Sequence, residues 1–208
     1  MVAREVECDI NRIRGAVAEF VARAGFDWAG LKAGRTAVPL ADLVDGHPLC
    51  LVEVRRLTPA SVSRHLAKRG LLAPVEGEKP RRALAGFVYG DSSRAFIFLN
   101  RDDPFARRRF SLAHEIGHFM LHGGGALARA TARPGPVQVD DEPEDPREVE
   151  AHAFAAELLM PWELVEEDAA PLRRGEIGPE RAVTRLATRL QVSRQAAARR
   201  LREWPGAA

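Results

Sequence analysis

The sequence predicts an α+β fold, in which helices pack around a small β-sheet and a helical tail follows. Two apolar segments, 83–89 and 94–100, are separated by the turn sequence GDSS, which is typical of an antiparallel hairpin. Elsewhere, apolar residues recur every three or four positions, which is the spacing of amphipathic helices. The length of 208 residues fits one domain with a small appendage. We expect a main domain over 1–168 and a helical tail over 169–208.

Composition and charge exclude several classes of protein. Apolar residues make up 46% of the chain, as in ordinary globular proteins, and a net charge of +2 does not indicate a broad nucleic-acid-binding field. Cys8 and Cys50 form neither a disulfide framework nor a C-x-x-C metal site. The N-terminus has no apolar signal core, and no apolar run of about eighteen residues predicts a membrane span. We therefore expect a cytoplasmic protein without a membrane partner.

Start and stop signals delimit the elements of the first half. Asp9 is a suitable N-cap for an amphipathic helix that ends at Gly25, and Thr58-Pro59 begins another helix. A largely apolar run with β-branched residues, 49–54, indicates a strand. The predicted elements are a helix over 9–24, a loop over 26–37, a short helix over 39–44, the strand over 49–54, a helix over 58–70 and the two hairpin strands.

One helix of the second half carries the pattern H-E-x-x-H. Asp102 and Asp103 precede Pro104, and acidic residues followed by a proline mark the beginning of a helix. Three glycines, 123–125, mark its end. Apolar residues recur at helical spacing between these limits, so the pattern lies in the middle of an apolar helix.

His114 and His118 lie four residues apart, so on a helix both imidazoles point the same way. Together they can bind one ion, and zinc accepts nitrogen, sulfur or carboxylate ligands while a catalytic zinc keeps one position for water. Glu115 can act as a base on that water. Tyr89 and His122 are candidate donors to an oxyanion. The pattern thus predicts a metalloprotease with one zinc per chain, against the alternative of a helix with two partly exposed histidines.

A catalytic zinc commonly has three protein ligands, so the set must be completed from elsewhere in the chain. One class of metalloprotease has a glycine three residues after this motif and a histidine six residues after it, but Leu121 and Gly124 occupy those positions. Glu148 and Glu150 open the next helix and point about 200° apart. We favour Glu148, because His152 lies one turn further on the same face and can hydrogen-bond a ligand. Glu150 stays the alternative.

The remaining elements are predicted to be helices, apart from one long loop. Residues 123–146 contain glycines, prolines and an acidic run that extends to residue 150. Because this loop follows the motif helix, a lid or substrate-gating role is a hypothesis. An exposed strand edge beside the motif helix would suit an extended peptide substrate. The predicted helices cover 146–160, 162–168, 179–190 and 193–204.

Two linked segments are similar to those of the ImmA/IrrE family of metallopeptidases. The first is RFSLAHEIGH at 109–118 with LH at 121–122, and the second is EVEAHAFAAELLMP at 148–161. The resemblance covers about 80–162 well, whereas the part before it is only loosely similar. The segment at 186–201 also looks like the helical tail that follows the protease core in that family.

The resemblance implies a compact zincin-like core with a small sheet. It implies His114 and His118 as zinc ligands, Glu115 as the catalytic base and a glutamate at the head of the next helix as the third ligand. It further implies a protein substrate, a helix-turn-helix repressor whose cleavage switches on stress-response genes. One departure concerns His152, because the family usually has Asn or Asp there, and a histidine can itself bind a metal.

The basic C-terminal segment supports a rival function, that of a DNA-binding or repressor-sequestering regulator without proteolysis. Residues 173–202 carry nine arginines and two glutamates. Val192-Ser193-Arg194 opens the last helix as in a helix-turn-helix motif. We favour an amphipathic tail that packs on the core or on a protein partner, because one basic helix pair at near-zero net charge is a weak indication of DNA binding.

Overall fold

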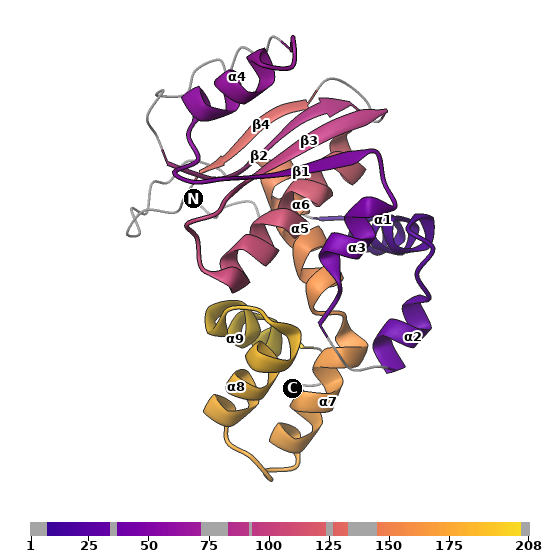
Figure 1. The fold of residues 1–208 in the computed structure, drawn as a ribbon. Coiled ribbons are helices and arrows are strands. Elements are labelled where there is room, and N and C mark those ends of the chain that lie inside the picture. Colours follow the sequence, from indigo (N-terminus) through magenta and orange to yellow (C-terminus); the bar gives the residue numbers. More distant parts are fainter. Residues whose placement is uncertain are drawn as a thin grey trace, which may run out of the picture.

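The fold is α+β, as predicted, with helices on both faces of a four-stranded sheet (Figure 1). The structure is a computed structural model. In the part of the chain that it describes, no helix combines the length and the apolar character needed to cross a membrane. The described residues are 8–33, 37–71, 83–91, 93–123, 127–132 and 145–204.

The sheet has the strand order β1-β3-β2-β4, so β1 and β4 form its edges. Strand β3 pairs in parallel with β1 and antiparallel with β2, and β2 pairs antiparallel with β4. The predicted hairpin is therefore present as β2 and β3, and the predicted strand over 49–54 joins it from a distant part of the chain. The strands are β1 Leu49–Val54, β2 Leu84–Asp91, β3 Arg94–Asn100 and β4 Leu127–Ala132.

The two faces of the sheet pack against different helices (Figure 1). Helix α4, Pro59–Ala67, covers one face, where Phe87, Phe96 and Phe98 are buried with its own apolar residues. The opposite face packs on the larger core, to which α1, α5 and α6 contribute. These three helices are α1 Ile10–Arg23, α5 Phe105–His122 and α6 Pro146–Leu159.

The N-terminal helices begin at capped positions. The Asp9 carboxylate accepts hydrogen bonds from the backbone N–H groups of Asn11 and Arg12, which starts α1 as predicted. The predicted loop over 26–37 is wrong in its middle, because it contains α2, Trp28–Ala33. The Asp27 carboxylate accepts from two backbone N–H groups of this short helix and so caps it. Helix α3 spans Leu40–Asp45, close to its predicted position.

The loop predicted over 123–146 is also corrected, because 127–132 form the edge strand β4. Its sequence, LARATA, contains mostly residues with little preference for strands. Pairing with β2 supplies the order, since the register runs from Leu84 opposite Ala132 to Gly90 opposite Leu127. Residues 124–126 and 133–144 of the same segment, and with them most of the hypothetical lid, lie outside the described residues.

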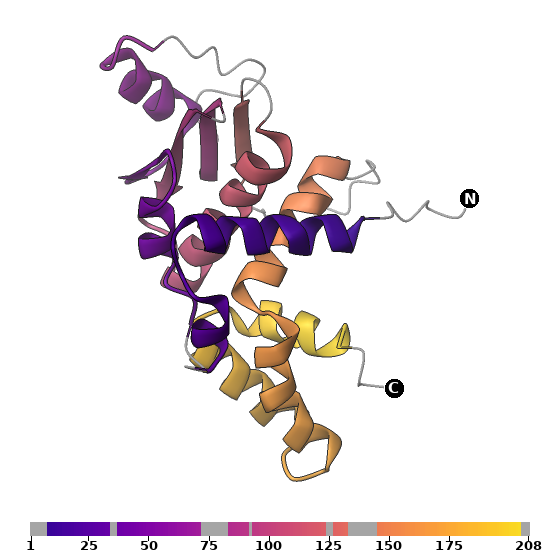
Figure 2. The same ribbon diagram turned by 90° about the vertical axis from the view of Figure 1, so that its right-hand side faces the viewer.

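The last three helices lie on the side of the molecule away from the sheet (Figures 1 and 2). They are α7 Trp162–Arg173, α8 Pro179–Leu190 and α9 Arg194–Arg202. Helix α7 is longer than the predicted 162–168, so the boundary expected after residue 168 falls inside a helix. Leu186, Leu190 and Leu201 are buried in the same core cluster as the helices under the sheet. The hydrophobic core is therefore continuous across that boundary.

Candidate metal centre

Helix α5 brings the two motif histidines together in the interior. His114 and His118 lie one turn apart and are 1% and 0% exposed. Their Nε2 atoms are 3.1 Å apart, so both imidazoles present the same nitrogen to one point. At this distance either one ring donates its Nε2 proton to the other, or both nitrogens turn their lone pairs toward a shared partner.

The carboxylate of Glu148 is the third group that lies next to the two Nε2 atoms. Its Oε2 lies 3.2 Å from His114 Nε2, and its Oε1 lies 3.2 Å from His118 Nε2. Burial raises the pKa of the Glu148 carboxyl, but hydrogen bonds from His114 and His118 outweigh burial and hold this pKa well below its ordinary value. The group is therefore an anion at neutral pH, which is the form that binds a metal.

A close helix contact places Glu148 over the histidines. A Cβ added at Gly117 would lie 3.1 Å from both Ala151 Cα and Phe154 Cβ, so α5 and α6 approach one another at the motif itself. Helix α6 begins with Pro146 in its first turn and Asp145 as its N-cap, which puts Glu148 at its head. The close contact between α5 and α6 at Gly117 thus places the Glu148 carboxylate next to His114 and His118.

The spacing of these atoms fits a zinc ion. Ligand atoms about 2.0–2.1 Å from a tetrahedral zinc lie roughly 3.3 Å from one another. The nitrogen–nitrogen separation is 3.1 Å and the two nitrogen–oxygen separations are 3.2 Å. Two imidazoles and a carboxylate are also a common donor set of catalytic zinc sites. The residues present would therefore hold such an ion with little rearrangement.

His152 stands beside the same cluster on its exposed side. Its Nδ1 donates to the backbone carbonyl of Glu148 at 2.9 Å, and its ring lies 4.6 Å from that of His114. Potential ligand atoms of His114, Glu148 and His152 all lie within 4.8 Å of one another, so this trio is a second candidate set. We assign the second nitrogen of the set to His118 and not to His152, because the contacts of His118, at 3.1–3.2 Å, are much shorter.

Glu115 is fully buried between α5 and the sheet. A Cβ added at Gly86 of β2 would come within 2.3 Å of Glu115 Oε1, so any side chain at this position would displace the carboxylate. Gly86 was not among the residues singled out from the sequence. A glycine inside a strand, where another group approaches the backbone, is the signal that could have found it.

Glu150 and His122 meet on the other side of His118. His122 Nε2 lies 2.8 Å from Glu150 Oε2, and His122 Nδ1 lies 3.3 Å from His118 Nδ1. Arg12 of α1 also donates to the Glu150 carboxylate. Burial raises the pKa of Glu150, but hydrogen bonds from Arg12 and His122 outweigh it and lower this pKa. Glu150 is thus held away from the point where His114, His118 and Glu148 converge.

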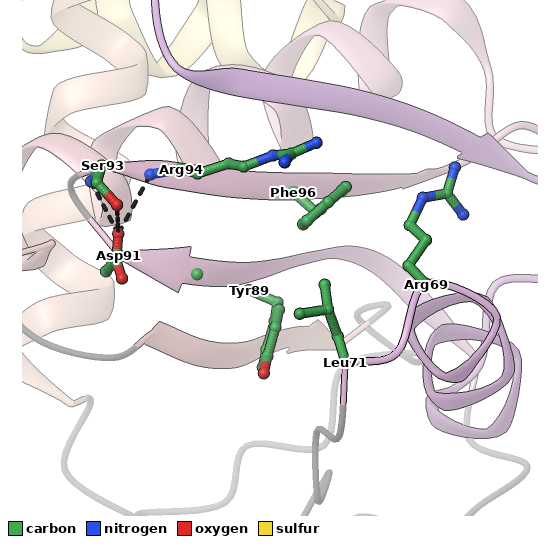
Figure 3. Close-up of a pocket in the computed structure, with 8 residues that line it drawn as sticks. Arg69, Leu71, Tyr89, Asp91, Ser93, Arg94 and Phe96 are labelled. Carbon is green, nitrogen blue, oxygen red and sulfur yellow. Dashed lines mark hydrogen bonds between the residues drawn. The ribbon is translucent and has the colours of Figure 1, made fainter.

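Tyr89 lies on the opposite face of the sheet from the histidine pair. It packs beside the cluster under α4, and it lines a pocket of about 580 Å³ together with Arg69, Arg94 and Phe96 (Figure 3). Side chains alternate along a strand, so the neighbouring Val88 points to the large core instead. This placement removes Tyr89 as a donor to an oxyanion. His122, the other candidate, contacts a predicted ligand directly.

Comparison with known families supports the assignment of this region. The family model for the IrrE N-terminal-like domain, a peptidase family, matches residues 78–202. The match contains the motif helix, the helix that carries Glu148 and the three helices that follow. No curated protein matches the chain significantly.

Proposed function

We propose that this chain, which belongs to the ImmA/IrrE family of metallopeptidases, is a zinc-dependent endopeptidase. The observation that carries the proposal is the convergence of His114 Nε2, His118 Nε2 and the Glu148 carboxylate at 3.1–3.2 Å. The family match supports a peptidase, and the donor set supports zinc. A zincin-like core is consistent with the placement of the motif helix directly beneath a mixed sheet.

Each side chain of the site has a definite task in peptide hydrolysis. A bound zinc would supply Lewis-acid polarisation of the scissile carbonyl and a lower pKa for the attacking water. His114, His118 and Glu148 would hold the ion, and two imidazoles with one carboxylate are a common donor set of catalytic zinc. Glu115 accepts the proton of the attacking water at its carboxylate and passes it to the amine that leaves. The Glu115 carboxylate is buried against Gly86 of the strand.

The edge strand β4 is the proposed place for an extended substrate. It follows α5 in the chain and pairs with β2 on one side only, so its other backbone edge is open to pairing within the described sheet. A peptide that adds to such an edge is held by backbone hydrogen bonds and therefore in an extended form. This arrangement suits an endopeptidase, because it does not require a free chain end.

A helix-turn-helix transcriptional repressor is the proposed substrate, on the strength of the family resemblance. The decisive experiment compares the wild type with Glu115→Gln in digests of candidate repressors analysed by mass spectrometry. We expect the variant to keep stoichiometric zinc and to lose cleavage, because its amide cannot accept the proton. Full cleavage by Glu115→Gln would refute the mechanism, and zinc binding without cleavage of any repressor would refute the substrate assignment.

The rival function as a DNA-binding regulator is weakened by the contacts of the tail. Arg194 pairs with Glu180, Arg199 pairs with Glu203, and Arg200 is buried against Glu157. The pairs of Arg194 and Arg199 are exposed and contribute little, so Arg200 is the residue that weighs against DNA binding, because its burial withholds it from a phosphate backbone. A helix-turn-helix likeness of α8 and α9 is therefore compatible with a structural tail. Strongly salt-dependent binding to duplex DNA would instead favour the DNA-binding regulator.

A further inference from the structure

Three histidines follow one another along α5 at intervals of one turn: His114, His118 and His122. His118 is the middle member and makes contacts through both ring nitrogens. Its Nε2 faces His114 and Glu148, and its Nδ1 lies 3.3 Å from His122 Nδ1. The contact to His122 lies outside the set of ligands, so it requires a separate explanation.

The chemistry of imidazole assigns a direction to this contact. A neutral imidazole has one N–H, so a ring that binds metal through Nε2 carries its proton on Nδ1. His118 therefore donates through Nδ1, and His122 must accept at its own Nδ1. The His122 proton is then on Nε2, which lies 2.8 Å from Glu150 Oε2 and donates to it. Arg12 donates to the other oxygen of Glu150, so every group in the chain has a matching partner.

The exposure of these side chains increases outward from the site. It rises from 0% at His118 to 8% at His122, 21% at Glu150 and 44% at Arg12. The buried hydrogen bonds next to the ligand are poorly accessible to competing water, and the anion at their end is neutralised by a cation on a different helix. This connection links α5, α6 and α1 around one ligand.

We infer that His122 and Glu150 are positioning residues, which hold His118 in the tautomer and orientation needed to bind zinc, with Arg12 anchoring Glu150. The inference rests on the proposed function and extends it to residues outside the ligand set. Partners that accept the second N–H of a metal-bound histidine commonly change metal affinity by about 10–100-fold. Glu150 thus serves the site through hydrogen bonds, whereas Glu148 serves it by direct contact.

The test measures zinc affinity by chelator competition in the full chain. His122→Phe keeps the ring and removes the acceptor, and Glu150→Gln keeps the size and removes the charge. Glu163→Gln is the matched control, because Glu163 also pairs with a cation on another segment, Lys32, but lies away from the site. Thermal unfolding of each metal-free variant is recorded beside the affinity, so that a change in folding is separated from a change in binding.

We expect about 10–100-fold weaker zinc binding in His122→Phe, a smaller but measurable loss in Glu150→Gln, which acts one hydrogen bond further from the ligand, and an unchanged affinity in Glu163→Gln. The double variant should lose less than the product of the two single losses, because both changes break one chain of hydrogen bonds. If His122→Phe does not fold, Glu150→Gln alone decides. Wild-type affinity in Glu150→Gln would overturn the inference.

A spectroscopic measurement tests the direction of the hydrogen bonds. In the zinc-loaded protein labelled with ¹⁵N-histidine, the His122 resonances, assigned by their absence from His122→Phe, should report a neutral ring protonated on Nε2. Protonation on Nδ1, or on both nitrogens, would overturn the inference. A wild type that binds no zinc would instead overturn the proposed function, and this inference with it, whereas zinc binding that is insensitive to Glu150→Gln overturns the inference alone.

Discussion

Two regions of this molecule concentrate ionisable side chains, and they use them in opposite ways. Between α5 and α6, two imidazoles and a carboxylate direct their lone pairs at one point, and the bridge that would satisfy all three is a cation. In the C-terminal helices, each buried charge meets an opposite charge. Arg200 donates to Glu157 at 2.7 Å, and Arg189 donates to Asp168 at 2.7 Å.

The candidate metal site thus differs from a structural ion pair such as that of Arg200 and Glu157. Arg200 also stacks 3.5 Å from the centre of the Trp162 ring and donates to the Met160 carbonyl, so its contacts join α6, α7 and α9 into one body. The two imidazoles and the carboxylate between α5 and α6, by contrast, contribute to function only when a metal ion binds to them. Changes in the first region should therefore alter metal binding, and changes in the second should alter stability.

The largest effect is expected for Glu148→Ala, which should lose stoichiometric zinc. Only two ligands remain, and a catalytic zinc commonly has three from the protein. The metal content after zinc loading and desalting is the measurement. The metal-free protein should also lose some stability, because the contacts that lower the pKa of Glu148 favour the folded state at neutral pH. Retention of one zinc per chain would show that the ligand set has been assigned wrongly.

The second region is tested by Arg200→Ala. We expect a loss of about 3–5 kcal/mol in the free energy of unfolding, because Glu157 would be left as a buried anion whose one remaining cationic partner among the described residues is the partly exposed Arg14. Urea denaturation measures it, and zinc bound per folded molecule should not change. The double change Arg200→Met with Glu157→Leu should cost less than Arg200→Ala, and an equal or greater cost would contradict the argument from the unpaired charge.

A smaller effect on both properties is expected for Gly117→Ala. The added methyl would press on Ala151 and Phe154 and move α6, and Glu148 with it, away from the histidines. We expect about 1–3 kcal/mol of destabilisation together with weaker zinc binding. The control is Gly15→Ala in α1, where no atom lies within 4 Å of the new Cβ and about 0.5–1 kcal/mol of stabilisation should result. Unchanged zinc affinity in Gly117→Ala would show that the helix contact at Gly117 does not determine the position of Glu148.

The smallest effect is expected at the surface of the tail. Arg194 and Glu180 form an ion pair whose side chains are 55% and 89% exposed. Arg194→Ala should therefore change the free energy of unfolding by less than about 0.5 kcal/mol, because exposed pairs are screened by water and salt. Thermal unfolding at low and high salt measures it. A larger, salt-dependent loss would place this pair with the buried ones and weaken the division between the two regions.

The sequence predicted those parts of the fold and site that depend on local spacing. The hairpin β2–β3, the helix that carries His114 and His118, and the beginning of α6 were all within reach, because caps, turns and helical periodicity act over a few residues. Strand β4 was missed, since its composition has little strand preference and only its pairing with β2 orders it. The length of α7 was missed as well, because Pro171 lies inside that helix.

The candidate site shows the same limit. Helix phase separated Glu148 from Glu150 by about 200° but did not say which of them meets the histidines. His122 was a candidate oxyanion donor, yet it lies against His118 and Glu150. Tyr89 was a candidate on the basis of its chemistry, and the register of β2 turns it to the other face of the sheet.

The sequence by itself determined the identity and order of the reactive groups, because residues four apart on a helix always share a face. Only the tertiary structure decided which groups from different segments meet. Gly117 lets α6 approach α5, Gly86 leaves room for Glu115, and Arg12 holds Glu150 away from the histidine pair. Positions within one helix follow from its backbone geometry. Distances between elements are set by side-chain packing, which exists only in the folded chain.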